Sequence, residues 1–230
     1  MKVYNRDGIS ARIARLSADL LESMVDSSLI VNLGVGFPTI VSDYLHNPRT
    51  FFHTENGMLG MGPTPAPEYE DLDITDAGSM PVSETPGCAY FDSAESFAII
   101  RGGHVDVTII GAFEVDSAGY IANWSIPGGD MLGVGGAMDL ICGAKTVVVA
   151  MSHRTKEGSS KLVKKCSLPL TGNRSADYVV TEFGVFRFAD GKITLISTGD
   201  DINTARLQEI TEADFEVSAE LKRLRLSDLH

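Results

Sequence analysis

Short apolar runs of buried-strand type, separated by segments with helical periodicity, constrain the fold of this chain more than any other feature. The runs occupy residues 29–33, 105–110 and 146–150, and continuous apolar strands are typical of a sheet that is covered on both faces. Ahead of the first run, apolar residues recur at helical spacing and predict an amphipathic helix over residues 9–27. The alternation of strands and helices predicts one α/β domain over residues 1–230.

Capping residues and turn residues set the bounds of the other predicted elements. Asp92-Ser-Ala-Glu95 resembles a capping box, and the glycines and prolines of residues 57–67 predict a loop. In chain order, the remaining predictions are a helix from Pro38 to about His46, a strand at 50–53, a helix from Asp92 toward Arg101, a hairpin at 115–124, a short helix from Ala137, a strand at 177–181, a hairpin turn at 189–192, a helix at 200–210 and a final polar helix within a polar C-terminal tail at 216–230.

Composition and charge exclude several classes of function. The 230-residue chain carries a net charge of −12, so nucleic-acid phosphates would be repelled. An anionic small ligand stays compatible with this charge, because backbone N–H groups can hold it. No apolar run approaches the ~18 residues of a membrane span, and the N-terminus has no apolar stretch of signal-peptide type.

Cysteine usage indicates the redox compartment. Cys88, Cys142 and Cys166 are widely spaced and form no CxxC pair, which argues against disulfides and against a zinc site. We expect small buried thiols rather than nucleophiles, and a reducing cytoplasm is the simplest location.

Three glycine-rich turns recur along the chain: NLGVG at 32–36, ENGMLGMG at 55–62 and GVGGAMD at 133–139. In α/β sheets, ligands bind at turns that follow the carboxyl ends of strands, and glycine permits close backbone approach there. None of the turns completes a dinucleotide or P-loop fingerprint. Close packing alone explains any one of them, but the carboxylate of Glu55 at a strand-end turn favours a site.

Other candidate residues carry weaker signals. His53, on the strand before the second turn, fits a packed core histidine better than a base. His104 and His153 have no cysteine or carboxylate at ligand spacing, so no metal site is expected. A group of lysines fits a solvated face, with contact to an anionic ligand as the alternative: Lys161, Lys164 and Lys165.

The sequence resembles the family I coenzyme A transferases, in the half that carries the catalytic glutamate. The resemblance rests on segments in the family's order and approximate spacing: FHTENGMLG, VNLGVGFP, AYFDSAESFAIIRGGHVD, GAFEVDSAGYIANWSIPG, GVGGAMDL and KCSLPLTG. It is strongest to the β subunits that act on succinyl-CoA with acetoacetate or 3-oxoadipate. The resemblance implies an open α/β/α sandwich with a mostly parallel sheet.

In that family a glutamate carboxylate attacks the thioester carbonyl and then carries coenzyme A as a glutamyl thioester. The resemblance implies that Glu55 is this nucleophile, and an ionised carboxylate needs no general base. It also implies an oxyanion role for the backbone of the third glycine turn, where Gly136 is expected to need a positive φ. Substrate or coenzyme A binding is expected at Asn32, Gly34, Gly36, Asn56, Gly57, Gly135, Gly136 and Ala137. Coenzyme A is expected as a substrate, with no permanently bound cofactor.

The sequence also departs from the family's pattern. Asp76-Ala-Gly-Ser79 stands where many members have Asn-Ala-Gly-Lys, and Gly128-Gly-Asp-Met-Leu-Gly133 stands where they commonly have Gly-Lys-Met-Val-Lys-Gly. Lysines that could face an anionic ligand are therefore missing. The departures leave the acyl group and the acceptor acid open.

Three functions fit these residues. The first is a coenzyme A transferase β subunit, which an intact Glu55-Asn-Gly motif favours. The second is an acyl-CoA hydrolase on the same fold, and the third is a catalytically silent ligand-binding subunit. For the first function we expect a separate α subunit, in an αβ or α₂β₂ complex, because only the glutamate-bearing half is present.

Overall fold

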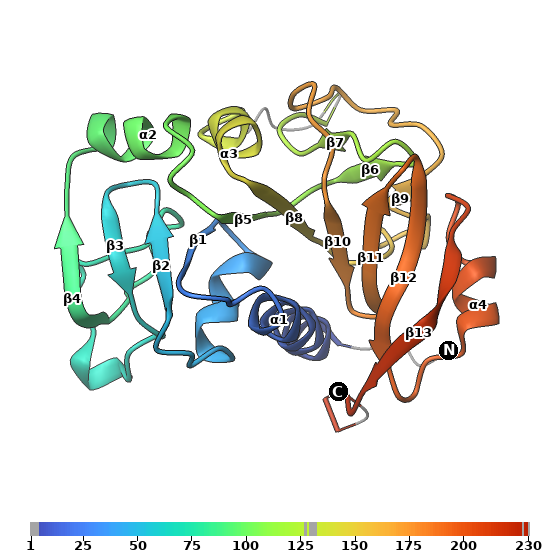
Figure 1. Ribbon diagram of the computed structural model, residues 1–230, viewed down its shortest axis with the longest axis horizontal. Coiled ribbons are helices and arrows are strands. Elements are labelled where there is room, and N and C mark those ends of the chain that lie inside the picture. The colour runs from blue at the N-terminus through green and yellow to red at the C-terminus, as the bar shows by residue number, and fades with distance from the viewer. Residues whose placement is uncertain (1–4, 127, 129–132, 227, 230) are drawn as a thin grey trace.

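Figure 1 shows the computed structural model of the chain, which describes residues 5–126, 128, 133–226 and 228–229. The helices are α1 (Arg6–Glu22), α2 (Ser93–Arg101), α3 (Ala137–Gly143) and α4 (Thr204–Glu209), with the 3-10 helices η1 (Phe37–Asp43) and η2 (Pro67–Tyr69). The strands are β1 (Leu29–Leu33), β2 (Thr50–Thr54), β3 (Met58–Met61), β4 (Glu84–Tyr90), β5 (Val107–Ile110), β6 (Glu114–Asp116), β7 (Ile121–Ala122), β8 (Thr146–Ala150), β9 (Leu162–Val163), β10 (Tyr178–Thr181), β11 (Gly184–Ala189), β12 (Lys192–Gly199) and β13 (Glu216–Leu224).

Ten strands form one sheet in the order β13-β12-β11-β10-β8-β5-β1-β2-β3-β4. The five central strands, from β10 to β2, are parallel. Antiparallel pairs flank this centre, with β3 and β4 on one side and β11 and β12 on the other. Strands β7, β6 and β9 form a second, small sheet. The predicted α/β class with a mostly parallel sheet is confirmed.

Alternate residues of the central strands divide the core into two layers, because successive side chains point to opposite faces. Val147 and Val149 of β8 pack with residues of α2 and α3. Val148 and Ala150 pack with residues of α1. Figure 1 shows α2 and α3 along the top of the view and α1 below the central strands. Helices on both faces produce the predicted sandwich.

Several local predictions are confirmed. Asp92 is the N-cap of α2, and its side chain accepts a hydrogen bond from the Glu95 N–H at 2.9 Å. Pro38 lies in the first turn of η1, although this is a 3-10 helix that ends at Asp43 rather than near His46, and α3 begins at Ala137. Strands β1, β2, β5, β8 and β10 lie where apolar runs predicted them, within one or two residues.

The predicted loop at 57–67 is partly wrong, because residues 58–61 form strand β3. β3 pairs antiparallel with both β2 and β4. Gly60 serves this pairing: it has a φ of 92°, and a Cβ there would lie 2.9 Å from the Cα of Cys88 on β4. The glycine indicates close approach of two strands at this position, whereas a composition rule treats it as a loop residue.

The predicted final helix is wrong, because residues 216–224 form strand β13 at one edge of the sheet. β13 pairs parallel with β12, and Lys222 Nζ lies 2.6 Å from Asp19 Oδ1 of α1. Tertiary pairing overrides the weak local preference of a polar segment.

Two predicted helices have different bounds. Helix α1 begins earlier, because the Asn5 side chain accepts from the Gly8 N–H at 2.7 Å, and it ends at Glu22 rather than near residue 27. The helix predicted from residue 200 begins only after its N-cap Asn203. Asp200 instead accepts from the Leu226 N–H at 3.1 Å.

Candidate active site

The carboxyl ends of neighbouring parallel strands open into a cavity of about 660 Å³. Its lining includes Gly34 after β1, Glu55 after β2, Gly111 after β5 and Met151 after β8. The first turn of α1 and the start of α3 complete the walls. This position, beyond the carboxyl ends of parallel strands, is where α/β sheets bind ligands.

The turn that follows β2 presents Glu55 to this cavity. The Gly57 N–H donates to Thr54 O at 3.0 Å and closes the turn. Gly57 has a φ of 127°, and a Cβ there would lie only 2.0 Å from Phe91 O, so no other residue fits without a backbone shift. Asn56 is exposed, and its Nδ2 donates to Thr75 O at 2.8 Å. The chain around Glu55 is therefore fixed on both sides.

Behind Glu55, a row of buried polar side chains crosses three parallel strands. Asn32 of β1 lies opposite His53 of β2 and opposite Thr108 of β5 in the strand register. Asn32 Nδ2 lies 3.1 Å from Glu55 Oε2 and 3.1 Å from His53 Nδ1. Thr108 Oγ1 donates to Asn32 Oδ1 at 3.3 Å. The amide of Asn32 thereby offers one N–H to the carboxylate and the other to the imidazole.

These contacts determine the protonation of His53. An amide NH₂ can only donate, so His53 Nδ1 must accept and Nε2 must carry the proton. His53 Nε2 lies 3.2 Å from Ser96 Oγ on α2, which can accept that proton. Burial lowers the pKa of His53 to about 4. A packed histidine is what the sequence indicated, and its ring orients Asn32 toward Glu55.

The third glycine turn lies against Glu55. A Cβ on Gly136 would lie 3.7 Å from Glu55 Cγ and 2.9 Å from the ring of Phe97. The expectation of a positive φ at Gly136 is wrong, because its φ is −83°; the left-handed residue is Gly135, with a φ of 52°. Close approach, and not backbone handedness, requires glycine at position 136.

The structure brings most of the predicted binding residues to the cavity wall. The lining includes Gly34, Gly36, Gly135, Gly136 and Ala137, together with Glu55. Asn32 is buried behind Glu55, and Asn56 and Gly57 shape its turn rather than line the cavity. The departure at residues 129–132 lies outside the described residues. Ser79 has a φ of 61° in a loop that the buried side chain of Asp76 holds.

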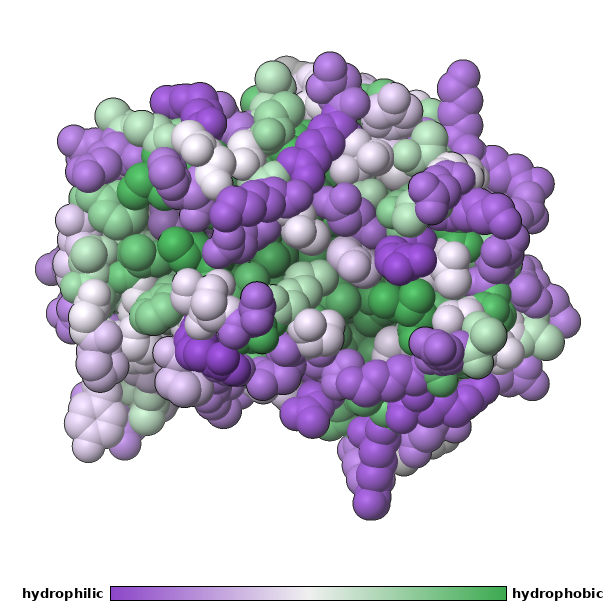
Figure 2. Space-filling model, in the orientation of Figure 1, coloured by the Kyte–Doolittle hydropathy of each residue, from purple (hydrophilic) through white to green (hydrophobic). Residues whose placement is uncertain are grey.

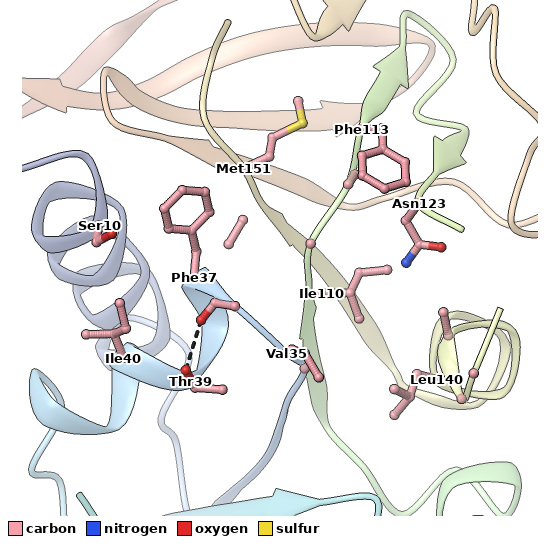
Figure 3. A pocket seen from close by; sticks show the side chains of 18 of the residues that line it. Ser10, Val35, Phe37, Thr39, Ile40, Ile110, Phe113, Asn123, Leu140 and Met151 are labelled. Carbon is pink, nitrogen blue, oxygen red and sulfur yellow. Dashed lines mark hydrogen bonds between the residues drawn. The ribbon is translucent and has the colours of Figure 1, made fainter. Parts of the chain in front are cut away.

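Sequence reasoning missed the apolar side of the cavity, which Figure 3 shows. It is formed by Val35, Phe37, Ile40, Ile110, Phe113, Leu140 and Met151, with Asn123 and Ser10 as polar neighbours. These residues come from α1, η1 and α3, from the last position of β5 and from the segments that follow β1, β5, β7 and β8. Strand-end position is the sequence signal that could have found those after β1, β5 and β8.

Lys161 also lines the cavity, whereas Lys164 and Lys165 are exposed. The interpretation of these lysines as one solvated face is therefore wrong for Lys161, which is half-buried. Burial lowers the pKa of the Lys161 ammonium to about 8, and the neighbouring charge of Glu182 opposes that shift. Burial raises the pKa of Glu182.

The remaining predictions concern thiols, metals and membrane spans. Cys88 and Cys166 are partly buried, but Cys142 is exposed, so the expectation of buried thiols is wrong there; all three are free. Among the described residues, no group of three or more His, Cys, Asp or Glu side chains could hold a metal ion. No described helix has both the length and the apolar character required to cross a membrane.

Known relatives match nearly the whole chain. The B subunit of a probable succinyl-CoA:3-ketoacid coenzyme A transferase from Bacillus subtilis is 47% identical over 84% of this chain and 90% of its own length. The β subunit of acetate CoA-transferase from Escherichia coli is 45% identical over 85% of this chain and 90% of its own. The B subunit of 3-oxoadipate CoA-transferase from Pseudomonas putida is 42% identical over 86% of this chain and 91% of its own length.

Solved structures share the fold at low sequence identity. An acyl-CoA transferase apoenzyme from Escherichia coli O157:H7 has a TM-score of 0.72 at 16% identity, covering all of this chain and 46% of that longer one. Glutaconate coenzyme A-transferase from Acidaminococcus fermentans has a TM-score of 0.69 at 16% identity, and the match covers 94% of this chain and 90% of that one. The coenzyme A transferase family model matches residues 18–212. The chain belongs to the coenzyme A transferase family and is an enzyme chain of the type that forms the B, or β, subunit of these transferases.

Proposed function

We propose that this chain is the glutamate-bearing subunit of an enzyme that moves coenzyme A between an acyl-CoA, such as succinyl-CoA, and a 3-oxoacid such as acetoacetate or 3-oxoadipate. Coenzyme A is a substrate here, and the proposal requires no permanently bound cofactor. The observation that carries the proposal is the Glu55 carboxylate, which faces a cavity at the strand ends while Asn32 Nδ2 holds it at 3.1 Å.

In the proposed first half-reaction, a Glu55 oxygen attacks the thioester carbonyl carbon, and the C–S bond breaks to release coenzyme A thiolate. The product is an acyl–glutamyl anhydride. The thiolate then attacks the Glu55 carbonyl carbon, and the C–O bond breaks to release the free carboxylate. Glu55 now carries coenzyme A as a thioester, and the acceptor carboxylate repeats both steps in reverse. Charge and protons balance throughout, so no general base is required.

Two neighbours of Glu55 suit the developing oxyanion. Asn32 supplies an amide donor, and Gly136 lets the backbone approach the carboxylate. The Ala137 N–H already donates to Val134 O at 3.1 Å, so we assign the backbone donor to the Gly136 N–H. Preorganised donors of this kind typically contribute about 10²–10³-fold to turnover.

The site is proposed to be completed by a separate α subunit, in an αβ or α₂β₂ complex. Exposed apolar side chains include Val35 of the cavity lining, which is 59% exposed, together with Met80 at 59% and Met138 at 50%. Figure 2 shows apolar residues gathered in a band across the middle of the visible face, between polar margins. Exposed apolar surface of this kind is typical of protein interfaces. The free cysteines suit a reducing compartment, and we propose the cytoplasm.

The direct test is to trap the intermediate. The chain, purified together with its α subunit, is incubated with succinyl-CoA without an acceptor acid, reduced with borohydride and digested. Peptide mass spectrometry should place the change at Glu55, within residues 52–60, and the Glu55→Gln variant should lack it. An unmodified Glu55 in a sample that transfers coenzyme A would refute the mechanism. Loss of thioester without transfer to added acid would identify a hydrolase instead.

A further inference from the structure

The end of the cavity that lies away from Glu55 holds the Lys161 ammonium, which interacts electrostatically with the buried carboxylate of Glu182. Lys161 lines the cavity and is half-buried. Its ammonium group has no hydrogen bond or ion pair to any other residue that the structure describes, although Lys164, three residues on, lies 4.0 Å from Asp214. Arg6, the other cation in the lining, is exposed. Among the described residues of the lining, Lys161 is therefore the cation with the more enclosed side chain.

The surroundings of Lys161 make its charge costly, because burial lowers its pKa despite the nearby charge of Glu182. Phe113 and Met151 are apolar residues of the same cavity lining (Figure 3), and burial destabilises a charge, a cost that Glu182 offsets only in part. The lowered pKa of the ammonium reflects that cost. An anionic ligand in the cavity would remove it. A single ammonium with carboxylates nearby, such as Glu182, suits a singly charged carboxylate better than a phosphate.

The position of Lys161 relative to Glu55 defines what the ligand must span. Glu55 follows β2, whereas the Lys161 N–H donates at 2.9 Å to His153 O, just beyond β8. β2 and β8 are three interstrand spacings apart, on the order of 14 Å. Both side chains are long and reach into the cavity, so the gap between their charged ends is shorter than this span. It suits a short acyl chain that has a charge at each end.

Asn123 adds a hydrogen-bond donor to the same end of the cavity. Its Oδ1 accepts from Thr171 Oγ1 at 2.7 Å. No described residue accepts a hydrogen bond from the Asn123 NH₂, and Figure 3 shows this nitrogen on the side toward Ile110. In the small sheet, β7 and β9 lie on either side of β6. Asn123 follows β7 and Lys161 precedes β9, so the two donors flank the same strand.

We propose that the Lys161 ammonium binds the distal carboxylate of a dicarboxylic acyl group whose other end reacts with Glu55. The substrates would then be short dicarboxylic acids and their half-thioesters, in preference to monocarboxylic acids of equal length. This inference rests on the proposed function for the reacting end. The binding of the distal end can nevertheless be measured without any reaction.

The first experiment uses titration calorimetry to measure how adipate and hexanoate, which differ only in the distal carboxylate, bind to the complex with the α subunit. The parent should bind adipate more tightly. Lys161→Met keeps the length of the side chain and removes its charge. It should lose on the order of 30-fold in adipate affinity, as truncation of a buried charge pair does. Its affinity for hexanoate should stay at the parent value. The matched control Lys165→Met changes an exposed lysine and should alter neither the adipate affinity nor the hexanoate affinity.

The second experiment compares transfer to 3-oxoadipate and to 3-oxohexanoate. Lys161→Met should raise the KM for the dicarboxylic acid and leave kcat for the monocarboxylic acid at the parent value. Equal affinity of the parent for adipate and hexanoate would overturn the inference. An equal loss of affinity for adipate and for hexanoate in Lys161→Met would also overturn it. So would a loss of adipate affinity that occurs only in Arg6→Met. A preserved preference for adipate without transfer to any acid would support the inference and refute the proposed function.

Discussion

The two ends of the cavity differ in how far their polar groups are satisfied. At the Glu55 end, the carboxylate, Asn32, His53 and Thr108 are joined by hydrogen bonds of 3.1–3.3 Å. At the other end, the Lys161 ammonium has no such partner among the described residues. The first arrangement is complete before any substrate arrives, which suits a group that must be held in a reactive geometry. The second needs an anion to complete it, which suits recognition.

The largest effect expected at the Glu55 end follows from removal of the nucleophile. Glu55→Gln is nearly isosteric and keeps an acceptor for Asn32, but an amide does not attack the thioester. Transfer should fall by more than ~10³-fold, while the melting temperature stays close to that of the parent. Steady-state transfer rates and thermal melts provide the measurement. Retention of a tenth of the parental rate would remove Glu55 from this role.

The next effect concerns the approach of the backbone to Glu55. Gly136→Val would place a branched side chain where even a Cβ lies 2.9 Å from Phe97 and 3.7 Å from Glu55. Turnover should fall by roughly 10²-fold if the Gly136 N–H is an oxyanion donor. The control is Gly133→Ala: among the described residues no atom lies within 4 Å of a Cβ added to Gly133, although its φ of 77° adds some backbone strain to the variant. Normal turnover in a folded Gly136→Val protein would leave this turn a packing role only.

A smaller effect tests whether His53 acts through Asn32. His53→Leu leaves one amide N–H of Asn32 and the Ser96 hydroxyl without their buried partner, which costs ~1–3 kcal/mol. We expect kcat to fall by about 10-fold with little change in KM, because Asn32 would no longer be held toward Glu55. His53→Gln can accept from Asn32 and donate to Ser96, so it should recover most of kcat. Equal rates in the Leu and Gln variants would contradict a positioning role.

The sequence predicted the Glu55 end better than the Lys161 end, and the reason is physical. Glu55 and the glycines around it lie on turns whose local sequence reports strand ends and close approach. Lys161 reaches the cavity only because β9 pairs with β6 and its N–H bonds beyond β8. Strand β13 was missed for a related reason, since pairing with β12 and not local preference makes it a strand. Long-range pairing leaves little trace in a single sequence.

The smallest expected effect concerns stability and the buried histidine at the Glu55 end. The pKa of His53 is lowered from 6.5 to about 4. Between these two pH values His53 is therefore protonated in the unfolded chain and neutral in the folded chain. The free energy of unfolding should therefore fall as the pH drops from about 6.5 toward 4, and His53 should account for about 1 kcal/mol near pH 5.5. Burial also lowers the pKa of His153, to about 3, so His153 contributes to the same loss of stability at low pH. Urea unfolding of the parent and of His53→Gln at pH 7.5 and 5.5 isolates the part due to His53. The variant should lose less stability than the parent over this interval, and an identical loss in both would show that His53 titrates normally in the folded chain.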